Sequence, residues 1–221
     1  MLNSEQRTIK TALSPNRLEA LTDGVFAIAM TLLVLGLGEP VLKGSSMHQE
    51  FTQLLDMWPK FTSYVVTFLM LGYMWSMHHW QFSFIKRADS VLIWINILFL
   101  MFTSLLPFST FLLGEYMGQQ LPVLVYGGNF MACMLMCYIK WSYATGKYRL
   151  IDTDIDWHEV KIRNMTVMIG IALFAIAMGI SYLNPIVSTG IFATTLVSSM
   201  IFSTLRFRIR TTEIDSKTVE I

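Results

Sequence analysis

The apolar residues of this chain gather into six blocks of about 20 residues, separated by polar segments. A helix rises about 1.5 Å per residue, so a block of this length crosses the roughly 30 Å hydrocarbon core of a bilayer. Of the 221 residues, 54% are hydrophobic and only 14% are charged, which is typical of a chain that crosses a membrane several times. The sequence therefore predicts an all-α membrane protein with six transmembrane helices in each chain.

The six predicted spans form a single domain over residues 1–221. Their expected bounds are about 16–38, 57–83, 90–113, 120–143, 164–183 and 186–205. Ser14 followed by Pro15 predicts the start of the first span, because a hydroxyl caps free backbone N–H groups and proline suits a first turn. Gly38 and Pro40 predict its end, and Pro107 is expected to kink the third span.

Lysines and arginines divide unequally between the two sides of the membrane that six spans define. Fourteen lie in the N-terminal segment, in and beside the loops after the second and fourth spans, and in the C-terminal tail. Only Lys43 and Lys60 lie on the other side. Because cytoplasmic loops carry the excess of positive charge, we expect both termini in the cytoplasm and the protein in the cell membrane. The net charge of +1 and the lack of a basic stripe give no sign of nucleic-acid binding.

The first span, residues 17–39, carries one aspartate, Asp23, inside its apolar part. An ionisable group within a membrane span indicates a functional site by default. On a helical wheel, one narrow sector holds Leu21, Ile28, Leu32 and Leu35. Gly24 and Thr31 flank this sector, and Asp23 points away from it. The helix thus has one aliphatic face and another that offers a carboxylate to neighbouring helices.

A layer of polar side chains is expected at one depth, about 9 Å inside the cytoplasmic end of the first three spans. Its members are Asp23 on the first span, Trp75, His78 and His79 on the second, and Trp94 and Asn96 on the third. Since an unpaired polar group is costly in a membrane, we expect these side chains to bond with one another. Arg17 either joins this layer or anchors the span at the interface by snorkelling.

Metal binding and catalysis find little support in the sequence. His78 and His79 point about 100° apart on a helix, which does not suit chelation of one metal ion. They are interpreted instead as hydrogen-bonding groups or as proton sensors, and which of the two histidines joins the layer stays open. Cys133 and Cys137 lack the second pair that a structural zinc site needs. A nucleophile with a base at workable spacing is not found, so neither an enzyme nor a cofactor is expected.

Arg17, Leu21, Thr22 and Asp23 stand in a pattern that resembles the RxxxFSD signature of the transmembrane protein 175 family of potassium channels. In that family the signature opens the first helix; here leucine replaces phenylalanine and threonine replaces serine. The segments WSMHHWQF at 75–82 and LIWINILFLMFTSLLPF at 92–108 are similar to the family's second and third helices. The resemblance covers most of residues 17–113. The six-span length matches the prokaryotic members, which carry one six-helix repeat instead of two.

This resemblance implies a homotetramer in the lipid bilayer, in which four copies of the first span surround a pore for K⁺ and other monovalent cations. It places the constriction at Ile28, Leu32 and Leu35, with Thr31 beside them. It also adds Arg17 and Thr22 to the polar layer as a structural network. Glu39 falls near the outer end of the same stripe, where it is expected at the pore mouth if the helix persists past Gly38.

Two other transport mechanisms stay open. A secondary transporter needs polar side chains or broken helices at the bilayer midplane, where the first three spans offer only Thr31, Thr67 and Thr103. A proton-conducting channel is the second alternative, because the sequence does not determine whether protons also permeate. Unitary current steps distinguish a channel from a carrier, which gives slow and saturable flux.

Overall fold

The computed structural model describes residues 15–39, 46–152, 155 and 157–201 of the chain. Ser14, Lys43 and most of the basic residues near the two termini lie outside this part. Predictions that use them are therefore based on the sequence alone.

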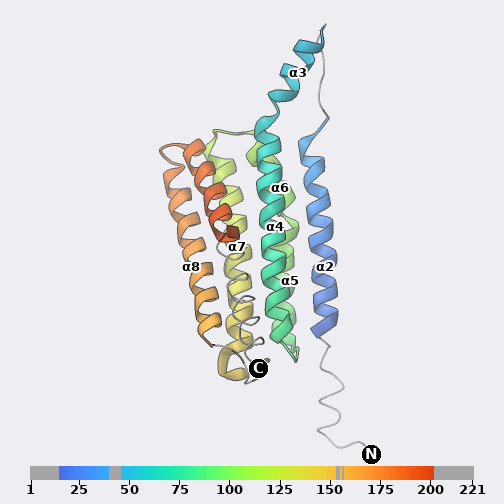
Figure 1. Cartoon of the computed structure of the whole chain (residues 1–221), viewed down its shortest axis with the longest axis vertical. Coiled ribbons are helices and arrows are strands. Elements are labelled where there is room, and N and C mark those ends of the chain that lie inside the picture. Colours follow the sequence, from blue (N-terminus) through green and yellow to red (C-terminus); the bar gives the residue numbers. More distant parts are fainter. Residues whose placement is uncertain (1–14, 40–45, 153–154, 156, 202–221) are drawn as a thin grey trace, which may run out of the picture.

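The described residues fold almost entirely into helices (Figure 1). The first is α2 (Pro15–Leu32), which continues as the 3₁₀ helix η1 (Leu33–Leu37). The next are α3 (Met47–Leu55), α4 (Trp58–Phe84), α5 (Ser90–Ser104), α6 (Leu106–Glu115) and α7 (Gln120–Thr145). After the 3₁₀ turn η2 (Gly146–Tyr148), α8 (Trp157–Ile180) and the helix Pro185–Ile201 complete the fold. Together they make an all-α membrane protein.

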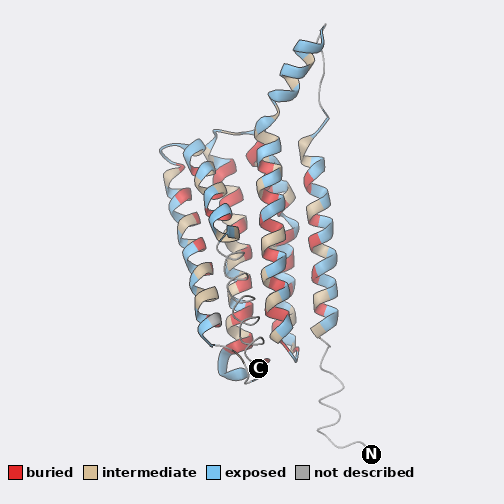
Figure 2. Ribbon diagram, in the orientation of Figure 1, coloured by how far each residue is buried: buried red, intermediate tan, exposed pale blue. Residues whose placement is uncertain are grey.

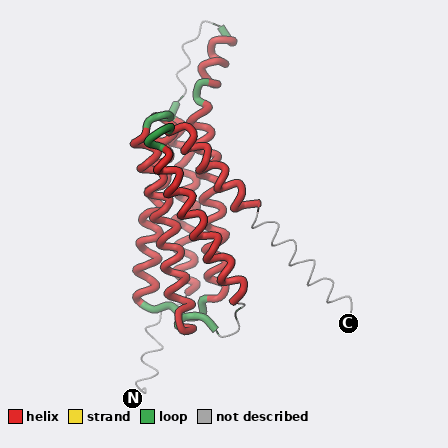
Figure 3. The backbone as a smooth tube through the Cα atoms, turned by 90° about the vertical axis from the view of Figure 1, so that its left-hand side faces the viewer, coloured by secondary structure: helices red, strands yellow, loops and turns green. Residues whose placement is uncertain are grey.

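The long helices lie side by side in a bundle (Figures 1 and 3), and α2 stands at one edge of it in Figure 1. The helix α7 packs against α5, α6 and α8, whereas α2 packs against α4 and α5. Residues that are buried lie mainly where the helices adjoin one another (Figure 2). The main core includes Phe26 of α2, Phe99 of α5, Tyr126 and Phe130 of α7, and Phe174 of α8. One face of α2 is thus packed against its own chain while the opposite face is not.

Within the described residues, four helices are long and apolar enough to cross a membrane by length and composition: Pro15–Leu37, Ser90–Glu115, Gln120–Tyr148 and Val160–Ile180. The helix α4 has 27 residues, but its threonines, serines, tyrosines, tryptophans and histidines lower its mean hydropathy. The described part of the last helix, Pro185–Ile201, is shorter than a full span. The fold is therefore that of a multi-pass membrane protein, and the count of six spans stays a prediction.

The kink expected at Pro107 is present as a break between α5 and α6 at Leu105. Proline lacks the N–H that a continuous helix requires, and it lies within the first two positions of α6, where that N–H is not needed. The amino end of α5 is capped by Asp89, whose carboxylate accepts a hydrogen bond from the backbone N–H of Leu92 at 2.9 Å. This segment is therefore two helices in line, with one proline-dependent break.

Two segments differ from the sequence-based expectation. The segment before the second span, expected to be a polar loop, contains the helix α3. The fifth span was expected from residue 164, but α8 begins at Trp157 because its charged first turns also form helix. In addition, η1 ends at Leu37 and Gly38 has a φ of 68°, so Glu39 lies beyond the first helix and not on its stripe. Glycine suits this position because other residues rarely adopt a positive φ.

Candidate pore helix and polar layer

The aliphatic stripe predicted on α2 lies on the face that the chain does not cover. Ile28 is 61% exposed and Leu35 is 71% exposed, and Leu32 lies between them on the same face. On the opposite face, Leu18, Phe26 and Leu33 are buried. In one chain, the stripe therefore lies largely outside the core, and another surface, protein or lipid, has to cover it.

Thr31 is exposed on the flank of this stripe, but its hydroxyl is already bonded to its own helix. It donates to the carbonyl of Ile28 at 2.8 Å, and the carbonyl of Ala27 lies 3.1 Å away. A threonine that bonds back to the preceding turn presents mainly its methyl group to the surroundings. The exposed face of α2 is thus more apolar than its sequence suggests.

Two carboxylates of α2 bond to aromatic side chains of α4. The indole N–H of Trp75 donates to Asp23 at 2.8 Å, and Nδ1 of His79 lies 3.0 Å from Oε1 of Glu19. Trp75 and His79 are one turn apart on α4, and their rings stack with centroids 5.8 Å apart. Asp23 and Glu19 are likewise one turn apart on α2. These pairs connect α2 and α4 along two successive turns.

A second set of bonds runs from α2 into the interior. The hydroxyl of Thr22 donates to the carbonyl of Leu18 at 2.8 Å and accepts from Nδ2 of Asn96 on α5 at 3.0 Å. Oδ1 of Asn96 in turn accepts from Nζ of Lys140 on α7 at 3.3 Å. Thr22, Asn96 and Lys140 are all fully buried. This chain of polar groups therefore ties α2 to α5 and α7.

Lys140 is the main member of this buried polar chain that sequence reasoning missed, since its position near the end of the fourth span suggested an interfacial charge. Its ammonium nitrogen lies 4.3 Å from the ring centroid of Phe99 and 5.4 Å from that of Phe82. These distances are in the range of cation–π interactions. A signal was available, because Lys140 shares a helical face with Cys133 and Cys137, both of which are buried.

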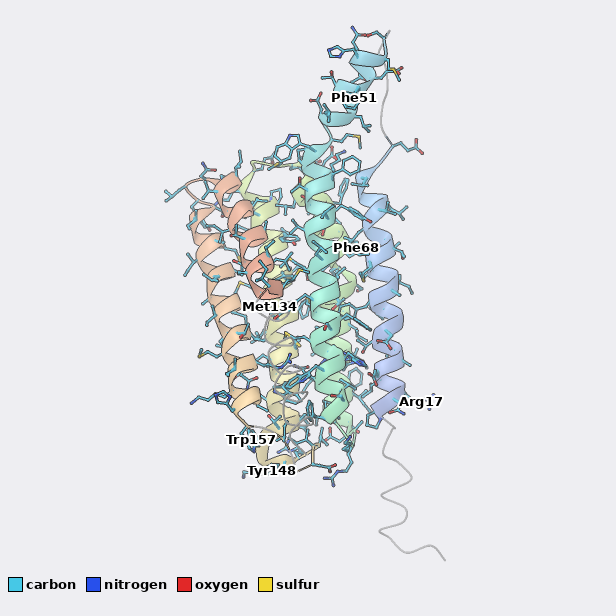
Figure 4. The ribbon with its side chains drawn as sticks, in the orientation of Figure 1. Arg17, Phe51, Phe68, Met134, Tyr148 and Trp157 are labelled. Carbon is cyan, nitrogen blue, oxygen red and sulfur yellow. The ribbon has the colours of Figure 1, made fainter. Side chains whose placement is uncertain are left out.

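The other predicted members of the layer lie apart from these bonds. Arg17 is exposed at the start of α2 (Figure 4), and Trp94 is 65% exposed on α5; within the described residues neither bonds to the layer. His78 is buried and stacks on Phe82 with ring centroids 4.3 Å apart, but neither ring nitrogen has a hydrogen-bond partner in the described part of the chain. The layer is therefore smaller on α5 than expected, and it extends to Glu19 and Lys140.

Metal chemistry is not indicated by the described residues, which contain no cluster of three or more histidine, cysteine, aspartate or glutamate side chains suited to a metal ion. Cys133 and Cys137 are free thiols in the bundle interior. They pack there as small apolar side chains.

Comparisons with known proteins agree with the resemblance in the first three spans. The model of the endosomal/lysosomal potassium channel TMEM175 family matches residues 17–107. A potassium channel of Chamaesiphon minutus is 34% identical over 178 residues, which are 79% of this chain and 88% of the relative. An endosomal/lysosomal proton channel TMEM175 of Gallus gallus is 34% identical over 110 residues, covering 47% of this chain and 22% of that protein.

A solved structure is also similar to the whole bundle. It is the crystal structure of a lysosomal potassium-selective channel TMEM175 homologue from Chamaesiphon minutus, with a TM-score of 0.75 and 30% sequence identity. The match covers 86% of this chain and 97% of that one. Sequence and fold thus agree over most of both chains, and the chain belongs to the TMEM175 family of potassium channels, a family of ion channels and not of enzymes.

Proposed function

We propose that this chain forms a homotetrameric channel that conducts K⁺, and other monovalent cations less readily, passively across the cell membrane. The pore is lined by α2 from four copies, and Ile28, Leu32 and Leu35 form successive rings around it. The observation that carries this proposal is the exposed aliphatic stripe of α2 at the edge of the bundle. A single helix at an edge does not enclose a pathway, so neighbouring copies supply the other walls.

The exposed arc of α2 and η1 is wider than the stripe itself. Ala20, Asp23 and Ala27 of α2 and Val34 of η1 are also exposed, up to about 140° around the wheel from Ile28. In the proposed tetramer, the stripe faces the axis and the rest of the arc faces the neighbouring copy. Asp23 and Glu19 then lie near a subunit boundary, held by Trp75 and His79 of their own chain. The polar layer acts as a scaffold that orients α2 and does not bind the permeating ion.

Rings of isoleucine and leucine offer methyl groups and no ligand to a permeating ion. Such constrictions gate by dewetting, because a narrow apolar ring excludes water. Selectivity then depends on ring diameter and on the cost of partial dehydration, so discrimination between K⁺ and Na⁺ is expected to be modest. Ile28, nearest the cytoplasm in the proposed topology, forms the narrowest ring. Glu39, exposed beyond the end of η1, increases the local cation concentration at the outer mouth.

The aromatic side chains at the two ends of the bundle support a bundle that crosses the bilayer. Trp58, Tyr116 and Tyr182 are exposed at the start of α4, the end of α6 and the end of α8. Tyr148 and Trp157 are exposed at the other end of the bundle, between α7 and α8 (Figure 4). Tryptophan and tyrosine prefer the two membrane interfaces. Two such belts, one at each end of the bundle, are what a bundle that crosses the bilayer requires. The cytoplasmic position of both termini stays based on the lysines and arginines of the sequence.

Reconstitution in liposomes tests the proposal directly. Planar-bilayer recording of the purified protein is expected to show unitary current steps, with a reversal potential that follows the K⁺ gradient more closely than the Na⁺ gradient. Native mass measurement in mild detergent is expected to give a tetramer. Slow, saturable flux without unitary steps indicates a secondary transporter and contradicts the channel mechanism. Only monomers and dimers in the mass measurement contradict the shared pore.

Proton permeation is a second candidate activity, favoured by the buried chain from Lys140 through Asn96 to Thr22. The vertebrate relative described as a proton channel also supports it. A pH-sensitive dye inside liposomes at zero K⁺ gradient measures this activity. Internal acidification under an imposed proton gradient, lost in Asn96→Leu, indicates proton passage along these groups. Dye signals equal to those of empty liposomes exclude it.

A further inference from the structure

The helix α3 carries an apolar face that the described part of its own chain leaves uncovered. Met47 is 88% exposed, Phe51 is 59% exposed, and Leu54 and Leu55 are exposed beside them. They recur at the spacing of one helical face, and Trp58 continues that face onto the start of α4. The opposite side of α3 carries Thr52 and other polar residues. An amphipathic helix with an open apolar face needs a surface to pack against.

The bilayer is a poor match for this face. α3 lies beyond the end of the bundle in both views (Figures 1 and 3), and Phe51 stands clear of the other helices (Figure 4). Trp58 belongs to the aromatic belt at that end, and nine helical residues reach up to about 13 Å past it. Residues 46–58 contain Glu50 and Asp56 but no lysine or arginine, whereas helices that lie on membranes are rich in both.

A second copy of the chain is the better match. α3 leans over the side of the bundle where α2 stands (Figure 1), and it lies between η1 and α4 in the sequence. That side faces the axis in the proposed tetramer, on which this inference rests. Four copies of α3 therefore converge just outside the pore mouth, near Glu39.

We propose that the four α3 helices pack against one another through Met47, Phe51, Leu54 and Leu55 and form an apolar collar above the pore mouth. The collar holds the outer ends of the subunits together. It makes α3 an assembly element instead of a loop. Glu50 is adjacent to the apolar face and lines the approach to the pore.

Disulfide cross-linking of the full chain in liposomes tests the collar. Phe51→Cys and Leu54→Cys place a thiol on the apolar face, and Thr52→Cys places one on the polar face as the matched control. The native Cys133 and Cys137 are buried, so the unmodified protein gives the background. Under mild oxidation we expect dimer bands from Phe51→Cys or Leu54→Cys at least several-fold stronger than from Thr52→Cys.

Three results contradict the collar in different ways. Equal or absent cross-linking of all three variants, in a sample whose mass is tetrameric, overturns the collar and leaves the proposed channel intact. A bimane label at Phe51→Cys that is quenched by brominated lipid shows that the bilayer covers α3. A mass that shows no tetramer overturns the proposed assembly, and the collar with it.

Discussion

Lys140 places an ammonium group in the interior of the bundle, between the rings of Phe82 and Phe99 and beside the amide of Asn96. Burying a charge is costly unless it is hydrogen-bonded, and the amide oxygen and the two aromatic faces offset part of that cost. Because Asn96 also donates to Thr22, the position of Lys140 is linked to the signature turn of α2. A residue on α7 thus contributes to the orientation of the proposed pore helix.

Lys140→Met is expected to destabilise the protein although methionine fits the apolar surroundings. The substitution leaves Oδ1 of Asn96 without its donor, and an unpaired buried acceptor costs about 1–3 kcal/mol. Thermal unfolding in detergent measures the change as a lower Tm. The double variant Lys140→Met with Asn96→Leu removes both partners of this hydrogen bond and leaves Thr22 bonded to Leu18. Its loss of stability should therefore be smaller than the sum of the losses in the two single variants. Additive losses mean that this hydrogen bond contributes nothing.

The bond between Asp23 and Trp75 gives a second prediction at this scale. Trp75→Phe removes the indole donor, and a hydrogen bond to a charged group contributes about 1.5–3 kcal/mol. We expect Trp75→Phe and Asp23→Ala to lower the yield of tetramer, and Asp23→Asn, which keeps an acceptor oxygen, to lower it less. None of the three should change the reversal potential between K⁺ and Na⁺. A changed reversal potential with unchanged tetramer yield identifies Asp23 as an ion ligand instead of a scaffold.

At the scale of the elements, the contact of α7 with the last two helices depends on Gly127. A Cβ atom at this position lies 2.8 Å from Cγ of Met178 on α8 and 2.9 Å from Cζ of Phe192 on the helix Pro185–Ile201. Neighbouring Gly128 has only the terminal methyl of Met178 at 4.0 Å. Glycines that allow close approach of helices are common in membrane bundles.

Gly127→Ala is therefore expected to lower the Tm, and Gly128→Ala is expected to keep or raise it. Overpacking costs roughly 1–3 kcal/mol, which exceeds the gain in helix propensity of up to about 1 kcal/mol from replacing glycine with alanine. Gly128→Ala obtains the same gain without the clash. Both variants are compared by thermal unfolding in one detergent. Equal Tm values for the two variants mean that α8 and the last helix move apart at no cost.

The long helices follow from the sequence because blocks of apolar residues report directly on burial in lipid or in the bundle. The helix α3 could not be predicted in this way, because a helix of nine residues is too short for a hydropathy window. Its own signal was the capping pattern Ser46-x-x-Gln49, in which the hydroxyl accepts from the backbone N–H of Gln49, followed by apolar residues at helical spacing. The early start of α8 was missed because its first turns are charged and extend the helix beyond the apolar block.

The site was predictable where one helix carries the pattern and less so where partners come from several helices. The stripe of Ile28, Leu32 and Leu35 follows from the wheel because it lies on one face of one helix. Which side chains bond across two helices depends on how each helix is rotated about its axis and on its depth in the membrane. A single sequence does not give either quantity. Thus Trp75 meets Asp23, but His79 meets Glu19, a residue with no place in the expected layer.

At the scale of the whole molecule, the edge position of α2 makes assembly necessary for the proposed pore. The bundle buries the Leu18, Phe26 and Leu33 face of α2 and leaves the opposite face open. The switch from α-helix to 3₁₀ helix after Leu32 changes the turn per residue from about 100° to about 120°. Leu35 nevertheless stays within about 40° of Ile28 on the wheel, so the proposed rings remain aligned along one axis.

The decisive substitution for the pore is Ile28→Asn, with Val34→Asn as its control. Both residues are exposed aliphatic side chains of the first helix, but Val34 points roughly 100° away from Ile28. Four asparagine side chains around the pore, one from each copy, would keep water in the constriction. We therefore expect Ile28→Asn to raise the unitary conductance and to bring the reversal potentials for K⁺ and Na⁺ together. Val34→Asn adds the same polar group facing a neighbouring copy or lipid, and it should leave both quantities unchanged. Equal effects of the two substitutions, or no effect of Ile28→Asn, mean that the stripe faces lipid or another helix and that ions pass elsewhere.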